Sequence, residues 1–234
     1  MTPSRKDRTT MGTDPSQAYQ APATPLARAS TDARAVFGQT MGLVAFTLGF
    51  FALGAYIGRD IEGTTGLIIM LASFVPLIAL NFAVRRNAQT LAIALLFAFG
   101  LMFGIGLGPA LNEYVKADPS AVWQAGGATA LFVAALGAYG YATKRDFSTW
   151  GRTLMFALLA LIGFGIVAIF VSIPGENIIY AVLGLIVFGF LTVFDFNRLR
   201  RSGMEMAPLI AASIFLDVVN IFLFFLSLFG GNRN

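Results

Sequence analysis

The chain has 234 residues, of which 57% are hydrophobic and only 12% are charged, and its formal net charge is +4. Soluble domains carry about 25% charged residues, so this composition excludes an ordinary water-soluble domain and indicates a polytopic membrane protein. The chain contains neither cysteine nor histidine, which excludes disulfides, thiolate metal sites and proton transfer by histidine.

The first part of the chain, residues 1–33, is rich in Ser, Thr, Pro, Ala and Gln, which predicts a disordered tail. No apolar stretch with a cleavage site follows its early basic residues, so we do not interpret it as a signal peptide. The seven apolar segments that follow are each long enough to cross a hydrocarbon core of about 30 Å. They cover residues 35–58, 64–84, 88–108, 121–142, 150–172, 177–198 and 207–229.

These segments predict the fold class and the domains. Helices are the only open-chain structures that satisfy their backbone groups in lipid, so we predict an all-α integral membrane protein with seven transmembrane helices. Residues 34–230 form the predicted transmembrane domain, and residues 231–234 form a short C-terminal tail.

The basic residues predict the orientation of the protein. If the N-terminus is cytoplasmic, 13 of the 16 Lys and Arg residues lie on the cytoplasmic side, which follows the positive-inside rule and places the C-terminus outside. Because these residues sit at helix ends, where they orient the protein in the bilayer, we expect no nucleic-acid partner.

Smaller features predict local structure. Two stretches of small residues, within residues 100–108 and 134–140, predict helix faces that pack closely in lipid. Asp146 and Ser148 precede the fifth segment as candidate helix caps, and Pro174-Gly175 breaks the chain after it.

Two aspartates interrupt the last two apolar segments, Asp195 in FLTVFDFNRLRR and Asp217 in ASIFLDVVNIFLFFL. An aspartate at the centre of a transmembrane helix costs about 2.5–3.5 kcal/mol and normally marks a pathway or a switch. Asp195 is three residues from Arg198, about 5 Å from the cytoplasmic helix end, whereas Asp217 lies about 15 Å inside its segment. Ser213 and Asn220 share a helix face with Asp217, which predicts a polar stripe.

The two aspartates leave two interpretations open. Asp195 pairs with Arg198 on its own helix, or it meets Asp217. Two carboxylates that meet cannot both ionise cheaply, so they would share one proton. Protonation would hold the last two helices together and deprotonation would push them apart, which predicts a pH-dependent two-state element.

Three stretches resemble the Bax inhibitor family of transmembrane proteins, in particular its bacterial members. They are YATKRDFSTWGRTL at residues 141–154, VFDFNRL at 193–199 and FLDVVNIFLFFLSLFG at 215–230. The resemblance covers residues 35–230 and implies six helices around a central seventh. It also implies that Asp195 and Asp217 close a pore on the cytoplasmic side.

Bacterial members of this family are described as pH-sensitive calcium leak channels. The resemblance therefore implies a cation leak gated by the aspartate pair, in a bacterial inner membrane. Asn220, Ser213 and Arg198, which lie one turn from an aspartate on the same helix, are the candidate supporting residues. It also implies an arginine latch from the second helix. That segment contains no arginine, so Arg85 and Arg86, just past its end, are the candidates.

The expected ligand is calcium as the permeating ion, with no cofactor. Calcium prefers about six to eight oxygen ligands, so Asp195 and Asp217 alone predict weak and transient coordination. The expected partners are the lipid bilayer, calcium ions and a membrane protein.

Three other functions are compatible with the sequence. The first is a non-transporting membrane regulator of the stress response or of membrane proteolysis, and the second is a proton-coupled cation transporter. The third is an intramembrane aspartyl protease, but such enzymes have a Gly-x-Gly-Asp turn, whereas Ile-Phe-Leu precedes Asp217 here. We therefore predict that the protein is not an enzyme.

Overall fold

The structure is a computed structural model that describes residues 25–170 and 176–230. Residues 33–234 form one compact unit, and residues 1–32 form another, of which only the start of the first helix is described. The predicted tails at residues 1–24 and 231–234 and the predicted break at Pro174-Gly175 lie outside the described residues.

The helices follow the predicted segments closely. They are α1 (Pro25–Gly58), α2 (Gly63–Ala72), α3 (Phe74–Arg85), α4 (Gln89–Ala117), α5 (Pro119–Ala142), α6 (Trp150–Phe170), α7 (Glu176–Leu199), a short 3₁₀ turn η1 (Met204–Met206) and α8 (Ala207–Gly230). Within the described part of the chain there is no strand, and seven helical stretches are long and apolar enough to cross a bilayer. The all-α membrane fold is therefore confirmed.

Helix α1 begins at Pro25, ten residues before the predicted start of the first segment. Residues 25–34 are rich in Ala and Arg, which favour helices, and proline is well suited to the first helical position. Residues 25–33, which the composition assigned to the predicted tail, are thus helical in this structure, and the stretch that can span the membrane starts near the predicted position, at Ala33.

The second predicted segment consists of two helices, α2 and α3, which meet at Ser73. Pro76 has no backbone N–H, so it cannot donate to the carbonyl of Ala72 four residues earlier. The Ser73 hydroxyl also donates to the carbonyl oxygen of Met70 at 2.6 Å, a bond that often bends helices. The break is therefore a local consequence of one serine and one proline.

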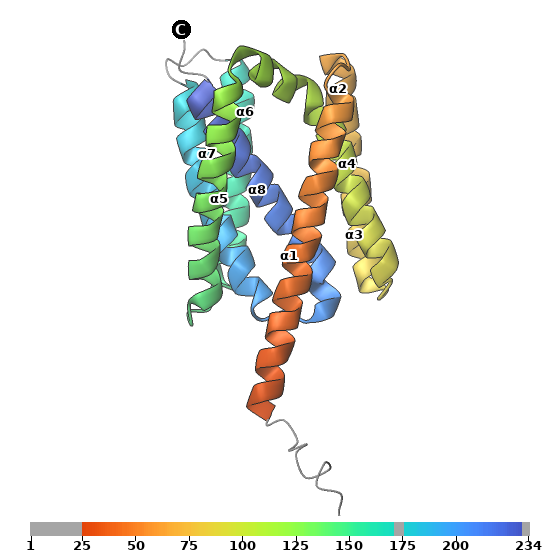
Figure 1. The fold of residues 1–234 in the computed structure, drawn as a ribbon. Helices are drawn as coiled ribbons and strands as arrows, with labels where there is room; N and C mark the ends of the chain where they lie inside the picture. The colour runs from red at the N-terminus through yellow and green to blue at the C-terminus, as the bar shows by residue number, and fades with distance from the viewer. Residues whose placement is uncertain (1–24, 171–175, 231–234) are drawn as a thin grey trace, which may run out of the picture. The chain divides into compact units, whose positions relative to one another are not determined.

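Helix α4 extends nine residues beyond its predicted end and contains Pro109 within it. Its 29 residues correspond to roughly 44 Å, more than the hydrocarbon core of a bilayer. Its last part crosses the end of the bundle toward α5, as Figure 1 shows. A proline inside a helix removes one hydrogen bond and can bend the helix without ending it. The helix therefore continues past Pro109, whereas the predicted segment ended at residue 108.

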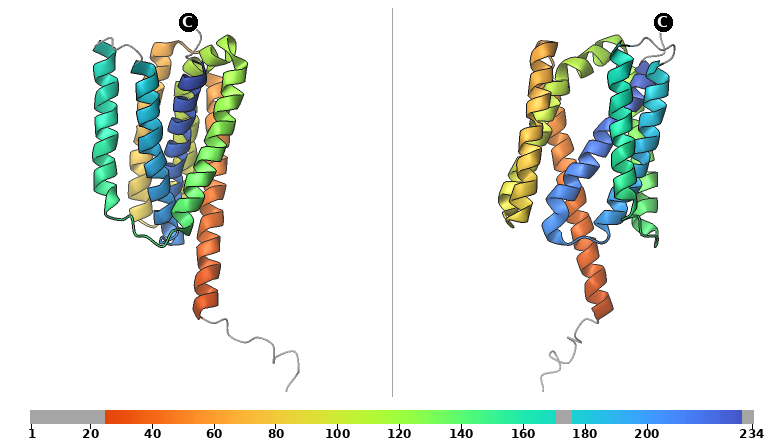
Figure 2. Two further views of the ribbon diagram at one scale, coloured as in Figure 1. Left: turned by 90° about the vertical axis from the view of Figure 1, so that its left-hand side faces the viewer. Right: turned by 180° about the vertical axis from the view of Figure 1, so that it is seen from behind.

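Helix α8 lies between two groups of helices, α1–α4 on one side and α5–α7 on the other (Figures 1 and 2). It packs against α7 and α5 most extensively, and also against α4 and α3. Phe51 of α1 and Phe103 of α4 contact Phe215 of α8, with ring centroids 5.8 and 6.3 Å apart. The C-terminal helix is therefore central, as the family resemblance implied, while α6 packs on α7.

The small residues of α4 allow close helix packing, as predicted. A Cβ atom on Gly104 would lie 2.9 Å from the carbonyl carbon of Phe51, and one on Gly108 would lie 2.7 Å from the carbonyl oxygen of Ala55. On the other face of α4, a Cβ atom on Gly106 would lie 2.5 Å from the Cβ of Met70 in α2. Backbone-to-backbone approach of this kind requires glycine.

Candidate functional site

The two aspartates are buried within the bundle. Asp195 lies in the last turns of α7 and is 6% exposed, and Asp217 lies in the middle of α8 and is 4% exposed. Among α2 to α8, the most extensive helix–helix contact is that between α7 and α8. The chain therefore brings two acidic side chains into the apolar interior of this contact.

The two aspartates are also close enough to interact electrostatically, and Asp217 is adjacent to Thr192, one turn before Asp195 in α7. Their positions along the sequence had suggested different depths in the membrane. Helix α8 runs obliquely through the bundle (Figures 1 and 2), so a given number of residues along it corresponds to a smaller change in depth than in an upright helix.

Direct pairing of Asp195 with Arg198 is not observed. The charge of Arg198 acts on Asp195, but none of the three ion pairs found among residues 33–168 and 177–230 joins these two side chains. Asp195 therefore interacts electrostatically with both Arg198 and Asp217, and among the described residues it forms neither an ion pair with Arg198 nor a hydrogen bond with Asp217.

One oxygen of the aspartate pair has unusual surroundings. Oδ2 of Asp217 is buried and has no hydrogen-bond partner in the described part of the chain. Buried polar atoms are almost always hydrogen-bonded, and an exception calls for an explanation such as an exchangeable proton or ion. Four buried side-chain polar atoms lack a partner among the described residues, and this oxygen is the one among them that belongs to a carboxyl group.

The predicted supporting residues occupy less distinctive positions. Asn220 is half-buried, and its Nδ2 donates to the carbonyl oxygen of Leu216 at 2.8 Å, within its own helix. Ser213 is also half-buried. The latch candidates Arg85 and Arg86 are both exposed at the end of α3, where neither forms an ion pair within the described residues. The structure therefore does not bring either arginine to the aspartate pair.

Metal coordination at this site would rest on few ligands. No group of three or more Asp, Glu, His or Cys side chains with the spacing of a metal site occurs among the described residues. The aspartate pair itself offers two carboxylates, far from a full calcium shell of about six to eight oxygens. Any calcium ion here would keep most of its water.

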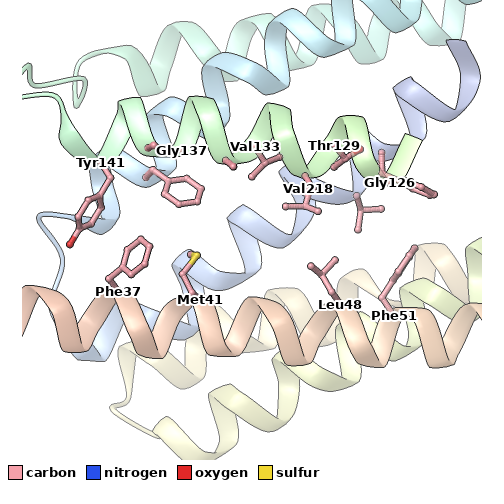
Figure 3. Close-up of a pocket in the computed structure, with 16 residues that line it drawn as sticks. Phe37, Met41, Leu48, Phe51, Gly126, Thr129, Val133, Gly137, Tyr141 and Val218 are labelled. Atoms are coloured by element: carbon pink, nitrogen blue, oxygen red, sulfur yellow. The ribbon is translucent and has the colours of Figure 1, made fainter. Parts of the chain in front are cut away.

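A large groove lies between the two helix groups, with a volume of about 850 Å³. Figure 3 shows Phe37 and Met41 of α1 facing Val133 and Tyr141 of α5 across it, with Val218 of α8 between them. Its lining is almost entirely apolar, so it offers an ion no replacement for its hydration shell. The groove is suited to lipid chains and does not form an ion pathway in this conformation.

The small residues of α5 divide between packing and this groove. Gly140 approaches the backbone of Val193 in α7, where a Cβ atom would lie 3.0 Å from its Cα. Gly137 lies against the ring of Phe196, as predicted for a packing face. Ala134 and Ala138, however, line the groove and are exposed. The packing prediction is confirmed for the glycines and does not hold for these two alanines.

Sequence reasoning missed Asn197, which lies two residues after Asp195 and is fully buried. Its side chain holds the loop between α5 and α6 through hydrogen bonds to Gly140, Arg145 and Phe147. The only signal in the sequence is a polar asparagine within an apolar segment, two residues after Asp195.

Asp146 in the same loop accepts the Ser148 N–H at 2.8 Å, as expected of a cap, and also forms an ion pair with Arg201. The Arg201 hydrogen bond, followed by that of Ser148, lowers the pKa of Asp146 to about 2. A lowered pKa means that the pair contributes to stability above the ordinary pKa of 3.8, and that this contribution is lost as the pH falls through about 2.

We therefore expect Asp146 to remain ionised down to about pH 3, because its arginine partner favours the charged carboxylate. The carboxyl ¹³C shift of Asp146 in aspartate-labelled protein would measure this titration. Arg201→Gln should move the midpoint upward toward the ordinary value. An ordinary midpoint in the unmodified protein would show that the ion pair does not form in solution.

The chain is similar to known membrane proteins over most of its length. A family model described as "Inhibitor of apoptosis-promoting Bax1" matches residues 33–234. A Caulobacter vibrioides protein without an assigned function is 32% identical over 189 residues, which cover 75% of this chain and 74% of that protein. The modulator of FtsH protease YccA from Escherichia coli is 27% identical over 198 residues, covering 83% and 89% of the two chains. Another Escherichia coli strain has a relative with the same identity and coverage, named inner membrane protein YccA.

Proposed function

Because the chain belongs to the Bax inhibitor family of transmembrane proteins, we propose that it is a pH-sensitive calcium leak channel gated by Asp195 and Asp217. The observation that supports this most directly is the buried aspartate pair at the contact of α7 and α8, with Oδ2 of Asp217 lacking a hydrogen bond. The proposed location is the bacterial inner membrane, where a relative is named as residing.

The proposed gate works through the charge of the pair. When the two carboxylates share one proton, a hydrogen bond replaces their repulsion and α7 stays against α8. When the proton leaves, two buried negative charges repel each other, since Arg198 is the only cation that acts on Asp195 among the described residues. Separation of the helices would admit water and cations toward the exposed carboxylates.

Calcium would be the permeating ion and not a resident one. Two carboxylates attract a divalent cation, but they supply too few oxygens to replace its hydration shell. Conduction requires binding that is strong enough for entry and weak enough for release. The small number of ligands at the pair therefore suits permeation.

Calcium flux into proteoliposomes containing the purified protein would test this proposal. We expect a low flux at acidic pH and a higher flux as the pH rises, because deprotonation opens the gate. Liposomes without protein provide the background. An imposed pH gradient that drives calcium uphill would show instead a proton-coupled transporter.

A second candidate function is regulation of membrane proteolysis without transport. It is favoured by the name of one relative, a modulator of FtsH protease. Such a regulator would bind a membrane protein partner, and it would carry no calcium at any pH. Absence of flux, together with altered turnover of a membrane substrate by a reconstituted membrane protease, would favour this function over the channel.

A further inference from the structure

The cytoplasmic end of α7 is tied to the loop between α5 and α6 by a buried asparagine. Nδ2 of Asn197 donates to the carbonyl oxygen of Gly140 at 3.2 Å and to that of Arg145 at 3.1 Å. Oδ1 of Asn197 accepts the N–H of Phe147 at 3.4 Å. Phe147 is itself buried, and its ring meets Trp150 edge-on, 4.9 Å away. One side chain thus joins α7 to the end of α5 and to the loop.

Arg201 extends this connection to the surface. Its Nη2 donates to Oδ1 of Asn197 at 2.6 Å, and its Nε donates to the carbonyl oxygen of Asn197 at 3.3 Å. Its Nη1 forms the ion pair with Asp146 in the loop. We call Asn197, Arg201 and Asp146 together the loop clamp.

The loop clamp has a protected half and an accessible half. Asn197 is fully buried, so its hydrogen bonds are shielded from water and salt. The Arg201 and Asp146 side chains are 35% and 62% exposed, so their ion pair is open to salt and to a partner. The basic side chains nearest in sequence are Lys144 and Arg145 beside Asp146, and Arg198 and Arg200 beside Arg201. The accessible half can therefore be released without disturbing the bundle core.

We propose that the loop clamp positions the last turns of α7, and with them Asp195, in the closed arrangement of the aspartate pair. This inference rests on the proposed channel function, because it assigns the clamp to the same gate. Asp195 and Asn197 lie two residues apart on one rigid helix, so a shift of the clamped end moves the carboxylate too. The clamp is not the pH sensor, because Asp146 stays ionised down to about pH 3.

Charge reversal provides the test, using Asp146→Arg, Arg201→Asp and the double variant that exchanges the two charges. We measure calcium flux against pH in proteoliposomes and deuterium uptake of residues 193–201 in the full chain. Each single reversal replaces attraction by repulsion and should raise both the flux at acidic pH and the deuterium uptake. The flux increase should be on the order of tenfold, as expected for about 1.4 kcal/mol of bias between two states. The double variant should restore both values only in part, because it restores the ion pair but not the two hydrogen bonds that Arg201 donates to Asn197.

A matched control is Glu113→Lys, which places a positive charge beside Lys116 and so replaces an exposed ion pair near the C-terminal end of α4 by repulsion. This variant should change neither value. Unchanged deuterium uptake in both single reversals would overturn the proposal. Increased uptake with an unchanged pH profile of flux would also overturn it, since the clamp would then be only a loop anchor. If the unmodified protein carries no flux at any pH, the channel proposal fails, and deuterium uptake still shows whether the clamp holds α7.

Discussion

Calcium leak should be lost when Asp217 is replaced by asparagine, and likewise when Asp195 is replaced. Asparagine keeps the size of the side chain and removes its negative charge and its exchangeable proton. Without repulsion between two carboxylates, α7 and α8 have no charge-driven reason to separate at any pH. Each single variant should therefore bring calcium flux in proteoliposomes down to the level of empty liposomes.

The prediction for Asp217 is the stronger of the two. Asp217 is the more buried aspartate and one of its oxygens lacks a hydrogen bond, so its ionised form has the least compensation. Asp195 has the charge of Arg198 nearby, which partly compensates it. We therefore expect any residual flux to be found in the Asp195→Asn variant.

Asp60→Asn is the matched control, because it is the same substitution on an exposed aspartate that pairs with Arg59 at 3.1 Å outside the bundle core. It should leave the flux and its pH dependence intact. Unchanged, pH-insensitive flux in both Asp195→Asn and Asp217→Asn would rule out gating by the pair. Thermal unfolding of each variant in detergent should accompany the flux, so that loss of folding is not taken for loss of conduction.

The sequence predicted the helices well because lipid imposes a simple rule on them. Every span must be apolar over about 20 residues, and this signal does not depend on contacts with the rest of the chain. The aspartates were found for the same reason, since a carboxylate in such a segment is costly. Features that follow from local chemistry were therefore predictable, including both the fold class and the candidate gate residues.

The helix ends and breaks were predicted less well, because they depend on details within the apolar segments. The sequence contains Pro76 and Pro109, but one accompanies a break at Ser73 while the other lies inside a continuous helix. A proline interrupts a helix or merely bends it according to the packing around it. Hydropathy is averaged over a whole segment, so it cannot distinguish a proline at a helix break from one inside a continuous helix.

Long-range polar contacts were not predictable from periodicity. Arg201 and Asp146 are 55 residues apart, and Asn197 bonds to groups 50 to 57 residues earlier in the chain. Nothing in the local pattern of either segment specifies its partner. The oblique course of α8 and the interaction of Asp217 with Asp195 likewise depend on how whole helices pack.

The contact between α1 and α4 is the basis of the largest stability effect that we expect. Replacing Gly104 by alanine adds a Cβ atom 2.9 Å from the carbonyl carbon of Phe51 and 3.0 Å from the backbone nitrogen of Ala55. The carbonyl oxygen of Phe51 would be closer still. Because these are backbone atoms, no side-chain rotation can relieve the overlap, so the two helices must move apart.

Moving the helices apart also disturbs the core beside the aspartate-bearing helix. Phe51 and Phe103 both contact Phe215 of α8, so a shift of α1 away from α4 opens this aromatic cluster. Overpacking of a close contact costs about 1–3 kcal/mol, and more where backbone must shift. For a domain of this size, each kcal/mol lowers the unfolding midpoint by roughly 2–4 °C.

Gly127→Ala in α5 separates this packing effect from the general effect of replacing glycine in a helix. A Cβ atom at Gly127 would meet nothing within 4 Å, so alanine there gains about 1 kcal/mol of helix propensity without any overlap. Thermal unfolding in detergent should therefore show a lower midpoint for Gly104→Ala and an equal or higher one for Gly127→Ala. Equal midpoints for the two variants would mean that α1 and α4 do not hold backbone contact in the folded protein. The oblique path of α8 between the two helix groups would then lose one of the contacts that supports it.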